Sequence, residues 1–256
     1  MIRSLYTAVS GLITLENKQS TIANNMANAN TTGYKTEDLA MKSFDEVLIQ
    51  NRDKLVGNTN YTQKLGTISL GTEIDSVITK FTQGDLKQTE SNTDFAINGR
   101  GFFVVQNGNR EVYTRDGGFI IDNNGFLTTT TGDKVLGVNN ATGATEPIYI
   151  GNSQDFYIDD NNRLVIDGVS TQTIKTADFQ DYSTLEKLAD NYYTGENPVY
   201  NTKISVVQSY LEASNVNITT EMVNMMTVMR NFESTQKVLT MLDETLGIAA
   251  SKVGKV

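Results

Sequence analysis

The chain has 256 residues, a formal net charge of -9 and a hydrophobic share of 38%. That length allows one or two domains with real cores, and the low hydrophobic share confines the core to part of the chain. The acidic balance, with no block rich in lysine and arginine, argues against binding to nucleic acid, which depends on clustered basic residues. Because cysteine and histidine are both absent, thiolate nucleophiles, histidine-based catalysis and the usual zinc sites are excluded.

Residues from about 2 to 29 carry apolar side chains at alternating intervals of three and four, which predicts a helix with one apolar seam. The run from Asn28 to Gly33 is expected to end this helix. Polar residues interrupt the start too often for a cleaved signal peptide, and no stretch has the roughly 18 apolar residues of a membrane span. The seam consists of Leu5, Ala8, Leu12, Leu15, Gln19, Ile22, Met26 and Ala29.

Residues from about 35 to 72 are polar and irregular, which indicates a connector or an extended hairpin with a weak helical pattern near 44–48. From about 73 to 180 the apolar period changes to two, and turn signals such as Asn107-Gly108 separate short strands. This pattern is typical of an all-β domain of sandwich or distorted-barrel type. The expected strands are 74–79, 95–98, 102–106, 111–114, 119–122, 126–129, 134–138, 156–158 and 163–167.

A strand-like run at 204–210 leads to a second predicted helix from Ile218 to about Ser251, weakened near Gly247. Its apolar side chains again alternate at three and four residues. Methionine-rich seams pack adaptably, so this one is interpreted as core formed with another chain. Polar residues within either seam are either register-fixing positions or solvated lapses in the pattern. The second seam consists of Ile218, Met222, Met225, Met229, Phe232, Gln236, Leu239, Asp243 and Leu246.

The sequence therefore predicts an α+β fold, in which N- and C-terminal helices pair as a coiled-coil layer and the centre is all-β. Four stretches are expected: 1–34 as the N-terminal helix of the inner domain, 35–72 as the connector or hairpin, 73–210 as the central β domain, and 211–256 as the C-terminal helix. A chain whose two ends are helices in need of partners is built to be assembled.

Three motifs are compatible with chemistry, and each is better explained by structure. The G-x-G at Gly99 and Gly101 is followed by a strand-like run, whereas a dinucleotide site requires a helix there. The segments 122–125 and 159–162 resemble calcium loops but lack the glycine at the sixth position and the downstream glutamate, so hairpin turns are expected. Adjacent carboxylates such as Asp243 and Glu244 are expected to be solvated. We therefore predict no enzyme activity, no metal and no cofactor.

Seven segments together resemble the bacterial flagellar rod and hook proteins, in order and over nearly the whole chain. The N-terminal signature is carried by 4–12 (SLYTAVSGL) and 22–35 (IANNMANANTTGYK). The central motif is carried by 81–86 (FTQGDL), 94–105 (DFAINGRGFFVV) and 113–117 (YTRDG), and the C-terminal signature by 211–217 (LEASNVN) and 221–226 (EMVNMM). The residues of this family motif are Asn24, Asn25, Ala27, Asn28, Thr31, Gly33, Tyr34, Gly99, Gly101, Phe102, Ser214, Asn215, Val216 and Asn217.

The resemblance implies a structural subunit of the flagellar basal-body rod that self-assembles into a helical tube and transmits torque. It implies as partners further copies, other rod and hook proteins and the flagellar type III export apparatus, with no small-molecule substrate. Export across the inner membrane would leave no cleaved signal peptide. The expected assembly interface consists of Leu5, Leu12, Leu15, Ile22, Met26, Ile218, Met222, Met225, Met229, Phe232, Leu239 and Leu246.

Three alternatives stay open at this point. A hook or hook-junction axial protein would carry the same signatures, although the single β region resembles a rod protein, and the segment 230–233 (RNFE) with Lys237 resembles the proximal-rod type. A secreted carbohydrate-binding β domain would leave both seams unexplained, and the chain has no tryptophan for stacking on sugars. A peptidoglycan hydrolase would need a pair of facing carboxylates, which the sequence does not reveal.

Overall fold

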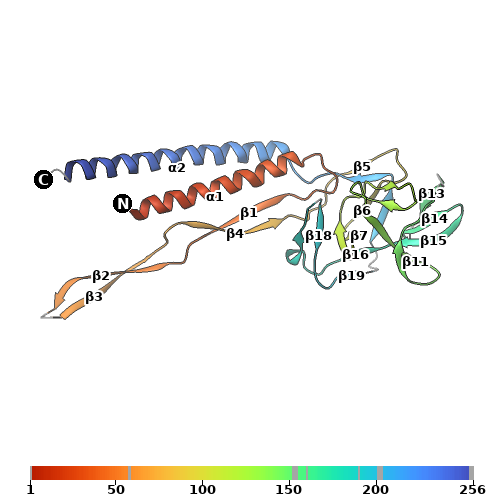
Figure 1. The fold of residues 1–256 in the computed structure, drawn as a ribbon, viewed down its shortest axis with the longest axis horizontal. Coiled ribbons are helices and arrows are strands. Elements are labelled where there is room, and N and C mark those ends of the chain that lie inside the picture. Colours follow the sequence, from red (N-terminus) through yellow and green to blue (C-terminus); the bar gives the residue numbers. More distant parts are fainter. Residues whose placement is uncertain are drawn as a thin grey trace. The chain divides into compact units, whose positions relative to one another are not determined.

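The computed structural model describes residues 2–56, 59–151, 155–159, 161–189, 191–200 and 204–253. The chain forms two compact units, each assembled from segments far apart in the sequence: residues 1–26, 37–78 and 218–256 make the first, and residues 27–36 and 79–217 make the second. A helix at each end and a β-rich centre confirm the predicted α+β class (Figure 1).

The first unit holds both long helices and two pairs of strands. Helix α1 ends two residues before the predicted end, and α2 runs without a break through Gly247, where a weakening was expected. Residues 35–72 contain β1 and the antiparallel pair of β2 and β3, and the weak helical pattern near 44–48 gives no helix. The elements are α1 (Ile2–Ala27), β1 (Glu37–Ser43), β2 (Val47–Val56), β3 (Thr59–Ile68), β4 (Thr72–Thr79) and α2 (Ile218–Val253).

Polar residues that lie beside the first seam give α1 a hydrogen-bonded face. Thr7 Oγ1 donates to the carbonyl of Leu70 at 3.0 Å, and Ser10 Oγ accepts from the amide of Thr72 at 3.3 Å. Gly71, between Leu70 and Thr72 in the chain, has a φ of +151°, and a Cβ there would lie 2.1 Å from Ser10 Oγ. Because only glycine permits this approach, the helix lies directly against the backbone that leads into β4.

Antiparallel pairing joins the strands of the first unit, β1 with β4 and β2 with β3 (Figure 1). Residue Lys42 of β1 forms exposed ion pairs with Glu73 and Asp75 of β4, at 3.4 and 3.2 Å. Ion pairs in water contribute little, so the hydrogen-bonded ladder is the main bond between these two strands.

The second unit contains short strands and one 3-10 turn. Nearly all of the strands predicted from the two-residue period are present, and several that carry no such period were missed. The elements are β5 (Leu86–Gln88), β6 (Phe95–Asn98), β7 (Phe102–Asn107), β8 (Arg110–Thr114), β9 (Ile120–Ile121), β10 (Leu127–Thr128), β11 (Lys134–Asn139), β12 (Thr145–Pro147), β13 (Phe156–Ile158), β14 (Arg163–Ile166), β15 (Val169–Ile174), β16 (Thr176–Asp178), η1 (Tyr182–Thr184), β17 (Glu186–Lys187), β18 (Tyr192–Thr194), β19 (Val199–Tyr200), β20 (Ser205–Gln208) and β21 (Tyr210–Glu212).

Over the described residues, thirteen of these strands form one antiparallel sheet with the path β13-β14-β15-β11-β7-β8-β18-β17. Strand β7 is buried on both faces: Phe103 packs in the main cluster, and Phe102 and Val104 pack in a second one. The pairs β20–β6 and β21–β5 are separate from that sheet. Ser209, at φ +60°, divides the predicted strand 204–210 into β20 and β21.

Among the helices of the described residues, neither combines the length and the apolar character that crossing a bilayer requires.

Candidate functional site

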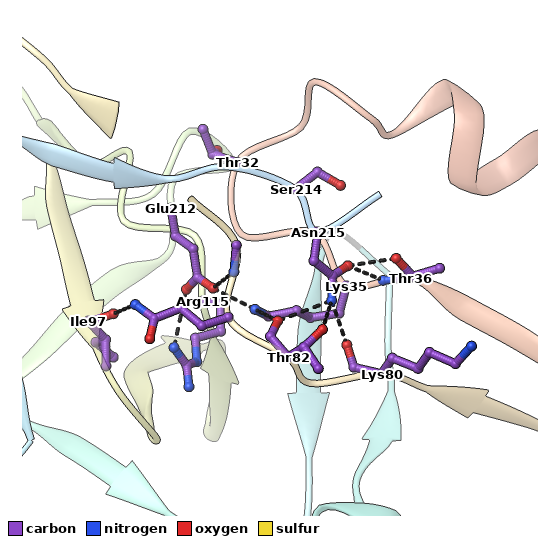
Figure 2. A network of polar contacts seen from close by, with 12 residues as sticks. Thr32, Lys35, Thr36, Lys80, Thr82, Ile97, Arg115, Glu212, Ser214 and Asn215 are labelled. Atoms are coloured by element: carbon purple, nitrogen blue, oxygen red, sulfur yellow. Dashed lines mark hydrogen bonds and ion pairs between the residues drawn. The ribbon is translucent and has the colours of Figure 1, made fainter. Parts of the chain in front are cut away.

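Three stretches of the sequence meet in the second unit, around a buried group of charged side chains. They are the end of the N-terminal signature, the central motif and the C-terminal signature, and the residues they bring together carry a charge, an amide or a hydroxyl (Figure 2). We call this group the polar cluster: Lys35, Thr36, Thr82, Arg115, Glu212 and Asn215.

Glu212 is the centre of the polar cluster. Its Oε1 accepts from Lys35 Nζ at 2.5 Å and from the amide of Gly84 at 2.9 Å, and its Oε2 accepts from Arg115 Nη1 at 3.1 Å. The carbonyl of Glu212 accepts a further bond from the amide of Gly33, at 2.8 Å. One residue of β21 is thus bonded to three segments that lie before it in the chain.

The two cations of the polar cluster are as buried as the carboxylate that pairs with them. The side chains of Lys35 and Glu212 have 0% exposure and that of Arg115 has 2%. Lys35 Nζ also donates to the carbonyl of Thr82 at 2.8 Å, and Arg115 Nη2 to that of Gly99 at 2.9 Å. Loss of the carboxylate would leave two cations unpaired inside the protein, which is strongly destabilising.

Burial lowers the pKa of Lys35 below its ordinary value, because removal from water disfavours the ammonium form. The Glu212 carboxylate opposes this shift, and the neighbouring Arg115 guanidinium adds to it. With Lys35 charged, the three ionised side chains would carry one surplus positive charge. Such a group requires close geometry and further hydrogen bonds, and both are present except at Arg115 Nε, which is buried without a hydrogen-bond partner.

Asn215 joins the same segments through its amide. Its Oδ1 accepts from the amide and the hydroxyl of Thr36, at 2.7 and 2.6 Å. Its Nδ2 donates to the carbonyls of Lys80 and Thr82, at 2.8 and 3.1 Å, and lies 2.9 Å from Thr82 Oγ1. An asparagine side chain can both donate and accept, so this residue reinforces a junction at which the amide of Lys80 already donates to the carbonyl of Thr36 at 2.8 Å.

A half-buried carboxylate lies near the polar cluster, in the loop after β8. Asp116 Oδ1 accepts from Thr32 Oγ1 at 2.6 Å and from the amide of Gly118 at 3.0 Å. Burial raises the pKa of Asp116, and the two hydrogen bonds oppose that rise. Gly33 lies beside it at φ +66°, and a Cβ there would lie 2.4 Å from the amide nitrogen of Asp116, so this position of the family motif requires glycine.

The other predicted motif residues have mostly structural places. In the first unit, the side-chain amide of Asn25 bonds both backbone groups of Glu37, the first residue of β1. Its Nδ2 donates to the carbonyl of Glu37 at 2.8 Å, and its Oδ1 accepts from the amide of Glu37 at 3.0 Å. Thr31 Oγ1 donates to Asn28 Oδ1 at 3.1 Å, and Asn24 and Ala27 are exposed.

Further along the motif, Tyr34 is buried with Lys187 Nζ 4.4 Å above its ring. Ser214 Oγ accepts from the amide of Val216 at 3.3 Å. Val216 is half-buried, and Asn217 directly precedes α2.

The segments that resemble a dinucleotide site or calcium loops form turns. Gly99 and Gly101, at φ +108° and +122°, connect β6 to β7, and Phe102 is fully buried in β7. The amide of Gly125 donates to the carbonyl of Asp122 at 2.8 Å, and that of Asn162 to the carbonyl of Asp159 at 3.0 Å. Asp160, part of the second calcium-like segment, lies outside the described residues.

The seam residues divide into two groups by exposure. Those of α1 are sheltered: Ile22 is buried, and Leu5, Leu12, Leu15 and Met26 are half-buried. In α2, the sheltered stripe shares only every second position with the seam drawn from the sequence. It consists of Glu221, Met225, Val228, Phe232, Thr235, Leu239, Leu242, Leu246 and Ala249.

The remaining seam positions of α2 are exposed. Ile218 is 40% exposed, Met222 49% and Met229 46%, and Val223 and Met226 beside them are each 52% exposed. We call these five residues the methionine patch. Large apolar side chains gathered in this way are typical of an interaction surface.

Lys35, Arg115 and Glu212 were not predicted as site residues, although each lies within a signature segment. They belong to no apolar period, and an isolated charged residue is usually exposed to solvent. Nothing in the sequence therefore indicated that they would be buried. The pairing of Lys35 with Glu212 spans 177 positions, which spacing along one sequence does not reveal.

Comparison with known proteins assigns a class to this arrangement. The family models described as flagella basal body rod protein, flagellar hook protein FlgE/F/G D1 domain and flagellar basal body rod FlgEFG protein C-terminal match residues 5–35, 96–176 and 207–252. The matches lie in chain order and include four members of the polar cluster. The class is therefore the structural axial proteins of the bacterial flagellum.

Relatives that match over their whole length narrow the assignment. The chain is 34% identical to the flagellar basal-body rod protein FlgG of Buchnera aphidicola subsp. Baizongia pistaciae, over 96% of this chain and 98% of the relative. It is 32% identical to the rod protein FlgF of Caulobacter vibrioides, over 100% of both, and 30% identical to FlgG of Bacillus subtilis, over 96% and 97%. The chain belongs to the flagellar basal-body rod protein family, whose members are structural proteins of the basal body.

Proposed function

We propose that this rod subunit polymerises into a helical tube that transmits torque, with α1 and α2 packed against the helices of neighbouring copies. The proposal gives the chain no catalytic role. The observation that carries it is the methionine patch, a set of exposed apolar side chains on a helix of a protein whose relatives are rod proteins.

The two stripes of α2 suit two different contacts. The half-buried stripe with Met225 and Phe232 is sheltered within a single chain, whereas Met222 and Met229 remain largely open to solvent. Burying a large apolar side chain contributes roughly 1.5–3 kcal/mol, so repeated contacts through this patch would stabilise a polymer. Methionine also adapts to neighbours that are not identically placed, as in a structure built of several related proteins.

The polar cluster supports a role in carrying mechanical load. Residues 35 and 36 follow the chain leaving α1, and residues 212–215 precede α2, so both are short links to a helix. Buried ion pairs and the Asn215 amide bond these two links to each other and to the central motif. A load applied to either link would be shared by this network.

The proposed route to the basal body is the flagellar type III export apparatus, without cleavage of a signal peptide. The support is the interrupted apolar run at the start of the sequence, which forms the ordinary amphipathic helix α1. Protein recovered outside the cytoplasm is expected to keep its first residues, and a processed N-terminus would contradict the route.

A hook or hook-junction position is the second candidate, because residues 96–176 match a model named for the hook protein as well as for rod proteins. The rod position is preferred because the compared whole-length relatives are rod proteins. Locating the chain in purified basal bodies separates the two positions.

Substitution in the methionine patch tests the proposal. Met229→Asp places a carboxylate on the exposed patch, and Asn231→Asp, two residues further on an exposed position of α2, is the matched control. Both proteins should keep the circular dichroism of the parent, because neither side chain is buried. Only Met229→Asp is expected to abolish incorporation into basal bodies, and normal incorporation of that variant would refute the interface.

A further inference from the structure

We propose that residues 204–216, here called the closing strap, dock as the last step in folding the second unit, which has no stable structure until they do. The strap contains β20, β21 and two members of the polar cluster, and it follows in sequence every strand with which it pairs.

The strap supplies strand partners that nothing else in the described chain provides. Strand β6 pairs with β20 in the register Ile97 to Val206, and β5 pairs with β21 in the register Lys87 to Leu211; neither β5 nor β6 has another strand partner among the described residues. Without the strap both would have unpaired backbone groups in a region where Phe95, Ala96 and Ile97 are at most 1% exposed, and unpaired buried backbone groups are costly.

The strap also completes the main hydrophobic cluster. Ile204 and Val206 are each 7% exposed and pack in the cluster that contains Phe103 and Leu164. The side chain of Asn162 binds the backbone of the strap: its Oδ1 accepts from the amide of Val206 at 2.9 Å, and its Nδ2 donates to the carbonyl of Ile204. Absence of the strap would open this core to water along one side.

The charges of the polar cluster make folding of the second unit depend still more on the strap. Lys35 and Arg115 are fully buried cations whose shared carboxylate, Glu212, comes from the strap. In a chain lacking docked Glu212, closing the interior around both cations would bury two unpaired positive charges, and each costs several kcal/mol. The interior is therefore expected to stay open until the carboxylate arrives.

One further side chain of the strap ties it to a different part of the sheet. Gln208 Oε1 accepts from the amide of Ile158 at 3.0 Å, and its Nε2 donates to the carbonyls of Asn92 and Phe156 at 2.7 and 3.2 Å. The strap is thus bonded at Ile204, at Gln208 and at Glu212, along most of its length, which favours docking as one step and disfavours gradual pairing.

The strap is made after the strands that it closes, so a growing chain would expose an incomplete second unit until residue 216 or so is available. Such a chain would stay unfolded for export. That consequence rests on the route proposed above, whereas docking of the strap is a property of the purified protein. Secretion that continues without the flagellar gate would refute the route and leave the strap untouched.

Native-state hydrogen exchange on the purified full-length protein tests the proposal. If the strap is required, the hydrogen-bonded amides of β20 and β21 open only when the sheet unfolds, so their opening constants should lie within about tenfold of those of β7 and β8. Strap amides that open more than about tenfold more readily than those of β7 and β8 would overturn the proposal.

Glu212→Gln adds a second comparison, because glutamine keeps an acceptor and removes the charge. Opening of β7, β8, β20 and β21 should increase together, on the order of 100-fold; an increase confined to β20 and β21 would overturn the proposal. Glu111→Gln is the matched control, because Glu111 pairs with the largely buried Lys175 at 2.7 Å without touching the strap. If Glu212→Gln does not fold, the comparison within the unaltered protein decides.

Discussion

Asn215→Ala tests the contribution of the polar cluster to stability most quantitatively. The substitution removes the bonds that Asn215 makes to the Thr36 amide and to the Lys80 carbonyl, whereas the Thr82 carbonyl keeps its bond from Lys35 Nζ. Asn215 is only half-buried, so water reaches part of the site and each of the two losses is taken at about 1 kcal/mol, the low end for an unsatisfied buried group. The free energy of unfolding should fall by about 2 kcal/mol, which lowers the melting temperature of a unit of this size by roughly 4–8 °C.

The assay is thermal unfolding of the purified protein, followed by circular dichroism of the β signal. Asn123→Ala is the control, since Asn123 is exposed in the turn between Asp122 and Gly125. Asn215→Asp should destabilise as well, because its second oxygen would face the carbonyls of Lys80 and Thr82 where Nδ2 now donates. If Asn215→Ala melts within about 2 °C of Asn123→Ala, the reasoning about this amide is wrong.

Two further substitutions probe the half-buried carboxylate of Asp116 and the sheltered stripe of α2. Burial raises the pKa of Asp116 in the folded state, so the folded protein holds this proton more tightly than the unfolded chain, and stability falls as pH rises from about 3.8 through the folded pKa. Asp116→Asn keeps an acceptor for Thr32 and Gly118 without titrating. Its stability relative to the parent should therefore grow across that window in urea titrations, and a constant difference would contradict the sign. Phe232→Asp places a charge in the sheltered stripe of α2, at a cost of several kcal/mol, and should prevent incorporation into basal bodies while the β signal persists; normal motility would contradict it.

The parts of the fold that could be predicted are those with a clear apolar period. The two long helices followed from spacings of three and four, and the strands around Phe95 and Phe102 from alternation between turn signals. Strands such as β17 and β19, with two residues each, are too short to show any period. The division of 204–210 at Ser209 depends on the positive φ of that one residue. A serine in a sequence does not indicate a positive φ.

The candidate site was predictable only as a set of segments. The signature residues identified the stretches around Gly33, Gly99 and Asn215, but nothing in the sequence indicated that they meet. The topology of the second unit brings together Lys35, Arg115 and Glu212. From their charges alone these residues would have been expected in solvent. In α2 the period was correct, yet the spacing did not distinguish the sheltered position of Val228 from the exposed position of Met229.

Cryo-electron microscopy of purified basal bodies is the decisive test of the rod position and of the helix packing, because it places the chain within the axial structure. We expect density for this chain in the rod, with α1 and α2 packed against the helices of neighbouring subunits and the methionine patch buried between them. Density for the chain in the hook, or a rod position in which the methionine patch faces solvent, would contradict it.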